Sequence, residues 1–142
     1  MEAVTARYVD VHTDVTVDAS RAKVHAAIVA LGEWWPHHAH EEGTISLEPW
    51  VGGRFFESWS SGGVLYGRVA RIEEGSYLAL DGTLGVEGVM SGECAFRLDG
   101  PADGPTTVTL VHHVIGNLPD GADAGYRQGA EHALAALAAH LG

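Results

Sequence analysis

The sequence predicts an α+β fold in which a curved antiparallel sheet is covered by one long C-terminal helix. Residues 7–18 alternate between apolar and polar side chains, which is typical of a half-buried strand. Further short strand-like runs follow a first helix and are separated by turn residues. The chain ends in an alanine- and leucine-rich run with helical spacing. Strands bracketed by helices favour α+β over a doubly wound sheet.

The first strand, residues 7–18, is predicted to have two distinct faces. One face carries Val9, Val11, Thr13, Val15 and Val17, and the other face carries the polar residues between them. Because successive side chains of a strand point to opposite sides, the valines are expected to face the core.

A short helix is predicted over residues 20–31. Val24, Ile28 and Leu31 recur there at helical spacing, with Asp18 or Ser20 as the N-cap. Gly32 follows directly, and we expect it to stop the helix.

After an irregular stretch at residues 34–43, the remaining chain is expected to form strands and then a helix. The predicted strands are residues 44–48, 53–59, 64–73, 76–81, 89–98 and 106–115. Residues 122–141 form the final helix, because Ala130, Leu134, Leu137 and Leu141 lie on one helical face. A single helix over the concave face of a curved sheet leaves room for a cavity between them.

Composition narrows the classes of function. A chain of 142 residues suits one domain, 1–142, and its net charge of −11 disfavours binding to nucleic acid or to anionic membranes. Cys94 is the one cysteine, so no internal disulfide forms. Residues 1–4 lack the features of a signal peptide, and no apolar run is long enough to cross a membrane. Together with the single cysteine, this favours a reducing cytoplasm. We expect the protein to be a monomer or a homodimer.

Local sequence adds a resemblance to a known family. The matching segments are Trp34-Trp35-Pro36, residues 47–57 (LEPWVGGRFFE), Gly67-Arg68-Val69 with Ile72-Glu73, and residues 107–112 (TVTLVH). The chain resembles the START-like, birch-pollen-allergen-like superfamily, often called SRPBCC. Within it, the chain is similar to the bacterial group labelled activator of heat shock protein 90 ATPase-like or polyketide cyclase-like.

The resemblance implies a helix-grip fold. In that fold a curved seven-stranded antiparallel sheet grips a long C-terminal helix, with one or two short helices after the first strand. Members of the family commonly carry a Gly-Trp pair in this helix, whereas here Gly129 is followed by Ala130. The missing indole is expected to enlarge the cavity.

Glu57 and His112 are the candidate catalytic residues. Glu57 shares a strand face with Phe55 and Trp59, and His112 shares one with Leu110. If both faces look inward, a carboxyl group and an imidazole meet in an apolar cavity, where they can exchange a proton. The alternative is that each is satisfied by ordinary hydrogen bonds and has no catalytic role.

The candidate ligand-binding residues are mainly aromatic. They are Trp35, Phe55, Trp59, Tyr66, Leu110, Tyr126 and Ala130. His37, His38 and His40 form a histidine cluster, but their spacing matches no standard metal motif, so we expect a solvated loop and no bound metal. One of these histidines is a candidate for the mouth of the cavity.

Three functions remain open at this point. The first is the binding of a small hydrophobic or aromatic molecule in the cavity. The second is a cofactor-free cyclase or dehydratase that acts on a polyketide-like substrate by acid/base catalysis. The third, suggested by the family label, is a protein-interaction module of the chaperone-activator kind. Phosphate-binding loops and nucleophile elbows are absent from the sequence.

Overall fold

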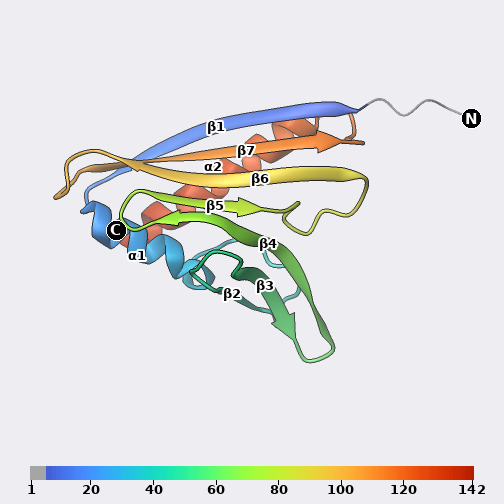
Figure 1. The fold of residues 1–142 in the computed structure, drawn as a ribbon, viewed down its shortest axis with the longest axis horizontal. Coiled ribbons are helices and arrows are strands. Elements are labelled where there is room, and N and C mark those ends of the chain that lie inside the picture. Colours follow the sequence, from blue (N-terminus) through green and yellow to red (C-terminus); the bar gives the residue numbers. More distant parts are fainter. Residues whose placement is uncertain (1–5) are drawn as a thin grey trace, which may run out of the picture.

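A computed structural model describes residues 6–142 and shows one sheet with a long helix across it (Figure 1). The strands are β1 (Arg7–Val17), β2 (Thr44–Leu47), β3 (Arg54–Trp59), β4 (Gly62–Glu73), β5 (Tyr77–Asp81), β6 (Met90–Asp99) and β7 (Thr106–Gly116). The helices are α1 (Arg21–Val29), the 3-10 turn η1 (Leu31–Glu33) and α2 (Ala122–Leu141). These elements confirm the predicted order, and most boundaries agree within two residues.

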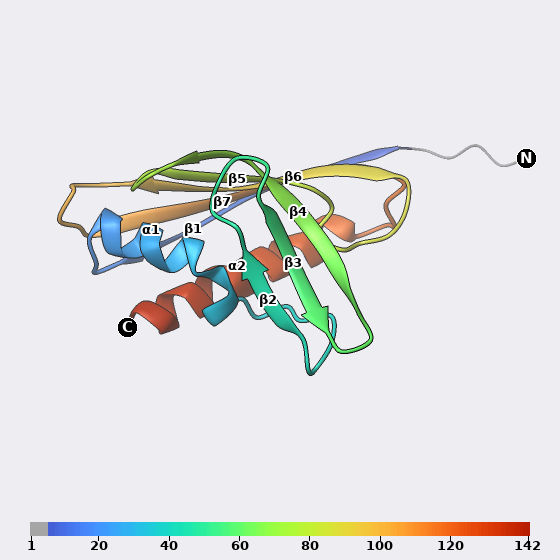
Figure 2. The same ribbon diagram turned by 60° about the horizontal axis from the view of Figure 1, so that its bottom comes forward.

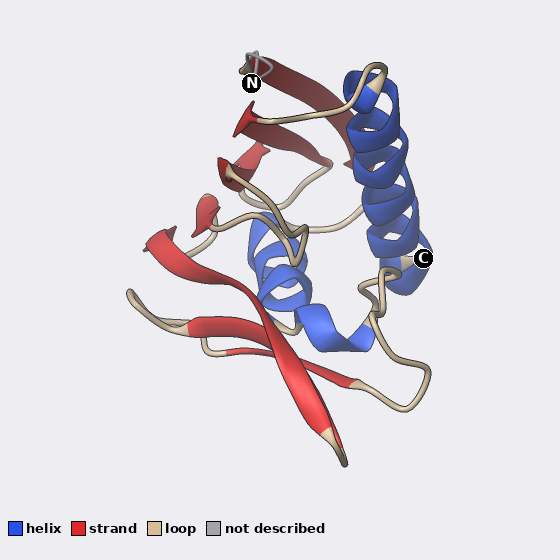
Figure 3. Cartoon of the chain, turned by 90° about the vertical axis from the view of Figure 1, so that its right-hand side faces the viewer, coloured by secondary structure: helices blue, strands red, loops and turns tan. Residues whose placement is uncertain are grey.

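All seven strands belong to one antiparallel sheet in the order β1-β7-β6-β5-β4-β3-β2. Strands β2 to β7 pair with their neighbours along the chain, while β1 pairs with β7 over its whole length. The sheet curves around α1 and α2, which lie on the same side of it (Figures 2 and 3). This arrangement confirms the α+β fold that the sequence pattern predicts and the helix-grip fold that the family resemblance implies.

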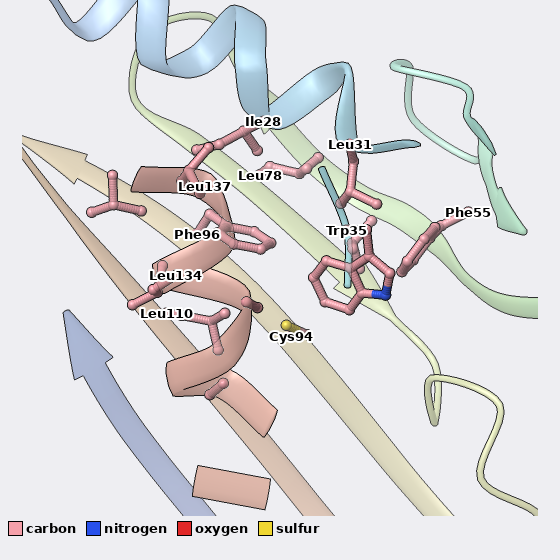
Figure 4. Packing of buried hydrophobic residues seen from close by; sticks show 14 of the residues in the cluster. Ile28, Leu31, Trp35, Phe55, Leu78, Cys94, Phe96, Leu110, Leu134 and Leu137 are labelled. Atoms are coloured by element: carbon pink, nitrogen blue, oxygen red, sulfur yellow. The ribbon is translucent and has the colours of Figure 1, made fainter. Parts of the chain in front are cut away.

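The core lies where the C-terminal half of α2 meets the sheet and α1. Leu134 and Leu137 of α2 are buried together with Ile28 of α1 and Phe96 of β6 (Figure 4). These side chains fill the space between the layers at this end of the molecule, and the hydrophobic effect holds the helix against the sheet here.

Helix α1 begins as predicted and ends earlier than predicted. The Ser20 side chain accepts a hydrogen bond from the Lys23 amide at 3.1 Å, which makes Ser20 the N-cap. The helix ends at Val29, and Gly32 lies inside η1, so its predicted role as the stop is wrong. A Cβ at Gly32 would lie 2.0 Å from the Ile45 carbonyl oxygen, which means that glycine lets η1 pack against the backbone of β2.

No helix within residues 6–142 is long and apolar enough to span a membrane. Residues 1–4, on which the expectation about a signal peptide rests, lie outside the described part of the chain.

Candidate functional site

A cavity of about 510 Å³ lies between the N-terminal half of α2 and the sheet. Strands β4, β6 and β7 contribute to its wall, and so do three loops: the one after η1, the β5–β6 loop and the β7–α2 loop. The lining residues are Trp35, His37, Tyr66, Leu84, Val86, Glu87, Met90, Cys94, Leu110, His112, Asn117, Leu118, Pro119, Ala122, Gly125, Tyr126, Gly129 and Ala130.

The small side chains of α2 account for the hollow. Ala122, Gly125, Gly129 and Ala130 line the cavity. Positions 122, 125 and 129 are each about one turn apart, so they lie on one face of the helix with Ala130 beside them. One turn further on, the same side of α2 carries leucines that fill the core. The helix therefore packs tightly at its C-terminal end and leaves space at its N-terminal end.

Aromatic and aliphatic side chains form the inner wall. Trp35, Tyr66, Leu110, Tyr126 and Ala130, all candidates from the sequence, line the cavity. Two other candidates do not lie on this wall. Phe55 is fully buried behind it, with its ring 5.4 Å from the Trp35 ring and 5.0 Å from the Tyr66 ring. Trp59 lies near the end of β3 and stacks on His40 at 4.9 Å.

A β-bulge turns Tyr66 toward the interior. Phe55 pairs with Gly67 and Phe56 pairs with Leu65, so Tyr66 is the extra residue of β4. Its hydroxyl group donates a hydrogen bond to Oε1 of Glu57, while the residue also lines the cavity. The bulge therefore connects the cavity wall to the carboxylate behind it.

His112 is a buried polar residue of the cavity wall. It is 4% exposed and meets the Tyr126 ring edge-on, with ring centroids 4.9 Å apart. Burial, together with the neighbouring His113, lowers the pKa of His112 from 6.5 to about 4. Its Nε2 has no hydrogen-bond partner among the described residues. The imidazole is therefore neutral at pH 7.

The other titratable groups deep in the cavity are also neutral. Burial, with a smaller contribution from Glu93, raises the pKa of the Cys94 thiol to about 12, and burial raises the pKa of the Tyr126 hydroxyl. Burial and the Glu57 carboxylate raise the pKa of Tyr66 as well. The interior thus offers weak hydrogen-bonding groups without charge.

The structure does not bring Glu57 and His112 together as the predicted pair. Glu57 is fully buried, and its carboxylate accepts hydrogen bonds from the Ala39 amide at 2.8 Å, the His40 amide at 3.1 Å and the Tyr66 hydroxyl. Burial alone would raise its pKa, but these hydrogen bonds and the nearby His38 outweigh it, so the pKa lies below its ordinary value. Glu57 is thus ionised, and its hydrogen bonds hold the loop of residues 34–43 in place. Its side chain does not line the cavity.

The loop histidines take separate partners. His37 lines the cavity mouth, where its Nε2 lies 2.9 Å from the Gly129 carbonyl oxygen of α2. The His38 ring nitrogen lies 3.7 Å from the Glu57 carboxylate. His40 stacks on Trp59. Glu57 and His37 together hold this loop over the side of the cavity.

Sequence reasoning missed the loops that complete the wall. Leu84, Val86 and Glu87 come from the β5–β6 loop, and Asn117 and Leu118 from the β7–α2 loop. These segments are irregular and have no periodicity that would assign them a face. The predicted strand order could have identified these loops. Strands β5, β6 and β7 are neighbours in the antiparallel sheet, so the β5–β6 loop and the β7–α2 loop lie at the same end of it.

The neutral state of His112 predicts a pH dependence of stability. The imidazole binds a proton less readily in the folded protein than in the unfolded chain, so stability falls as the pH drops from about 6.5 to about 4. The shift corresponds to at most about 3 kcal/mol. Denaturant unfolding of the parent protein and of the His112→Gln variant between pH 7 and pH 4 measures this loss of stability. The parent should show the loss and the variant should not. The same change at the exposed His140 is the control, and an equal pH dependence in all three proteins would contradict the assignment.

No family model matches the chain, and no curated protein matches it either. Solved structures do match. An uncharacterized protein from Rhizobium leguminosarum is 21% identical over 97% of both chains, with a TM-score of 0.71. Ara h 8.0201 is 17% identical over 94% of this chain and 97% of its own, with a TM-score of 0.62. The di-domain ARO/CYC StfQ from the steffimycin biosynthetic pathway is 13% identical over 93% of this chain and 50% of its own, with a TM-score of 0.61. These likenesses show a shared fold.

Proposed function

We propose that this helix-grip protein binds a small, uncharged hydrophobic or aromatic molecule in the cavity between α2 and the sheet. The observation that carries the proposal is the cavity itself. Its volume of about 510 Å³ falls within the range of roughly 300–1,000 Å³ that is usual for small-molecule sites. Aromatic rings and small aliphatic side chains dominate the wall, and a few polar groups are available to orient a ligand.

The charge distribution supports an uncharged ligand. Apart from histidine, Glu87 is the one formally charged side chain among the described lining residues, and it lies exposed on the β5–β6 loop. Deeper in, the imidazole of His112 and the hydroxyl of Tyr126 are neutral. A charged ligand would lose its hydration without gaining a counter-ion there, which is costly. A hydroxyl or N–H group on the ligand would find a hydrogen-bond partner in His112.

N-phenyl-1-naphthylamine, an uncharged aromatic probe with one N–H donor, tests the proposal directly. Its fluorescence should rise on binding, and Trp35 should be quenched because it lies on the wall. At 100 times its dissociation constant the probe should stabilise the native protein by about 2.7 kcal/mol. That gain corresponds to roughly 5–10 °C in Tm. A panel of lipids, flavonoids and polyketides then ranks natural ligand classes, and no shift with any of these compounds would contradict the proposal.

The contact between His112 and Tyr126 favours one second candidate, a cofactor-free cyclase or dehydratase. A neutral, partly desolvated imidazole can accept a proton, and a neighbouring phenol can donate one. The ARO/CYC designation of StfQ supports a polyketide-like substrate. In this version His112 touches the substrate, while Glu57 acts at a distance by positioning Tyr66.

Measuring turnover of an aromatic polyketide intermediate distinguishes a binding protein from an enzyme. His112→Gln should reduce kcat by about 100-fold or more while binding of the naphthylamine probe changes little. Tyr126→Phe keeps the ring and removes the hydroxyl, so it tests the proton donor alone. Unchanged turnover in both variants would remove the catalytic candidate and leave the binding proposal standing.

A further inference from the structure

Three metal-ligating side chains meet on the opposite face of the sheet, away from the cavity. Within the described residues, Asp10, His12 and His113 are the one group of three or more His, Cys, Asp or Glu side chains with converging ligand atoms. One ring nitrogen of each histidine and a carboxylate oxygen of Asp10 lie within 4.8 Å of one another. Oδ1 of Asp10 lies 2.8 Å from Nε2 of His12 and 3.3 Å from Nε2 of His113.

The pairing of the two long strands brings these residues together. Asp10 and His12 are two positions apart on β1, so both point away from the buried valines between and around them. His113 lies directly opposite Asp10 on β7. Because β1 and β7 pair along eleven consecutive positions, the three side chains are carried by a regular, rigid part of the sheet.

The hydrogen bonding of His113 suits a metal ligand. Its Nδ1 lies 2.9 Å from the hydroxyl oxygen of Tyr8, one row further along β1. When Nδ1 donates its proton to that oxygen, the lone pair of Nε2 is free and directed toward Asp10. Metal-bound histidines generally use their second ring nitrogen in this way, which fixes the ring and its tautomer.

The spacing also suits a tetrahedral ion. Two ligand atoms bound to one tetrahedral zinc ion at about 2.0–2.1 Å are separated by about 3.3 Å. The separation of 3.3 Å between Nε2 of His113 and Oδ1 of Asp10 equals that value. The separation of 2.8 Å between Nε2 of His12 and Oδ1 of Asp10 is a hydrogen-bond distance, which would lengthen by about 0.5 Å around a bound ion. Two imidazoles and one carboxylate form a donor set that zinc and related first-row transition metals accept.

We propose that Asp10, His12 and His113 form a surface site for a divalent transition-metal ion of the zinc class. The three protein ligands leave a fourth position open to water or to an external ligand. Glu93 lies opposite His113 on β6, and Asp81 lies opposite Glu93 on β5. These carboxylates add negative potential beside the site and attract a cation. The site is separate from the cavity and does not depend on the proposed function.

Calorimetric titration of the whole chain with Zn²⁺ tests the site. We expect saturable binding of one ion per chain. Loss of an outer-shell partner typically weakens metal binding by about 10–100-fold, so loss of a direct ligand should cost at least about 100-fold. His113→Gln and Asp10→Asn should each show that loss. His132→Gln on the exposed side of α2 is the matched control and should bind like the parent.

Cobalt substitution gives a second, spectroscopic readout. Co²⁺ bound by two imidazoles and a carboxylate in tetrahedral geometry should give visible absorption that vanishes in the His12→Gln/His113→Gln double variant. Because both residues lie on the solvent side of the sheet, circular dichroism without metal should match the parent. Absence of saturable binding in the parent, or equal Zn²⁺ affinity in the parent and the double variant, would overturn the proposal.

Discussion

Ala130→Trp should abolish binding of N-phenyl-1-naphthylamine, raising its dissociation constant by at least about 100-fold. Ala130 lies on the cavity-facing side of α2, beside Gly129, and it lines the cavity together with Leu110 and His112 of β7. An indole attached there has to enter the cavity, because the adjoining core is already filled by Leu134 and its neighbours. The substitution also creates the Gly-Trp pair that the sequence resemblance led us to expect at positions 129 and 130.

The same change should leave stability unchanged or improve it. Filling a hollow with an apolar ring commonly adds about 0.5–2 kcal/mol. Ala135→Trp on the exposed side of the same helix is the matched control, and it should bind the probe like the parent. Fluorescence titration gives the affinity, and thermal unfolding gives the stability.

Gly125→Phe is a second cavity-filling variant, which tests the same prediction if Ala130→Trp does not fold. A Cβ at Gly125 meets no atom within 4 Å, so a ring can enter the cavity from there without displacing backbone. Replacing glycine inside a helix also tends to stabilise it. If both variants fold and still bind the probe with parental affinity, the probe binds elsewhere and the cavity is not the binding site.

Much of the fold could be predicted because periodic patterns determine which side chains face the core. The alternation in residues 7–18 separates the buried Val9 and Val11 from Asp10 and His12. The same reasoning places His112 inward and His113 outward, and both placements agree with the structure. The spacing of Leu134 and Leu137 similarly identifies the core-facing side of α2.

The site was less predictable because its main features depend on register and on backbone atoms. The Glu57 carboxylate is satisfied largely by the amides of Ala39 and His40, which carry no signature in the sequence. The inward turn of Tyr66 depends on a bulge that strand alternation does not reveal. The meeting of His113 with Asp10 likewise follows from the β1–β7 register, which short-range patterns leave open.

Glu57→Gln should lower the free energy of unfolding by about 3 kcal/mol. The carboxylate accepts hydrogen bonds from two backbone amides and one hydroxyl while fully buried. In glutamine an NH2 group replaces one carboxylate oxygen, and it would face groups that donate hydrogen bonds to that oxygen in the parent. At least one of these buried donors therefore loses its acceptor. Glu42→Gln on the exposed part of the same loop is the control and should change stability by less than about 0.5 kcal/mol.

The pH dependence of the Glu57 contribution has a definite sign. Because the pKa of the folded carboxyl group is lowered, the contribution is present above the unfolded pKa of about 4.5 and is lost as the pH falls below it. His112 destabilises the protein over a higher range, from about pH 6.5 to about 4. The stability of Glu57→Gln should therefore still fall between about pH 6.5 and pH 4, where His112 takes up a proton. It should lack the additional loss below about pH 4.5, which comes from protonation of Glu57.

Gly43 supplies an independent test of the same anchor. A Cβ at Gly43 would lie 1.7 Å from Oε2 of Glu57, so the loop can approach the carboxylate only with glycine at this position. Gly43→Ala should therefore destabilise the parent by displacing the carboxylate from its donors. In a Glu57→Ala background the same change meets no carboxylate and should cost much less, which gives a coupling energy of about 1 kcal/mol or more. Two results would contradict this role of Glu57: losses of stability from Gly43→Ala and Glu57→Ala that simply add, or a Glu57→Gln variant as stable as the parent. Either result would mean that other contacts hold the loop over the cavity, and the hydrogen bond between His37 and Gly129 would be the next to test.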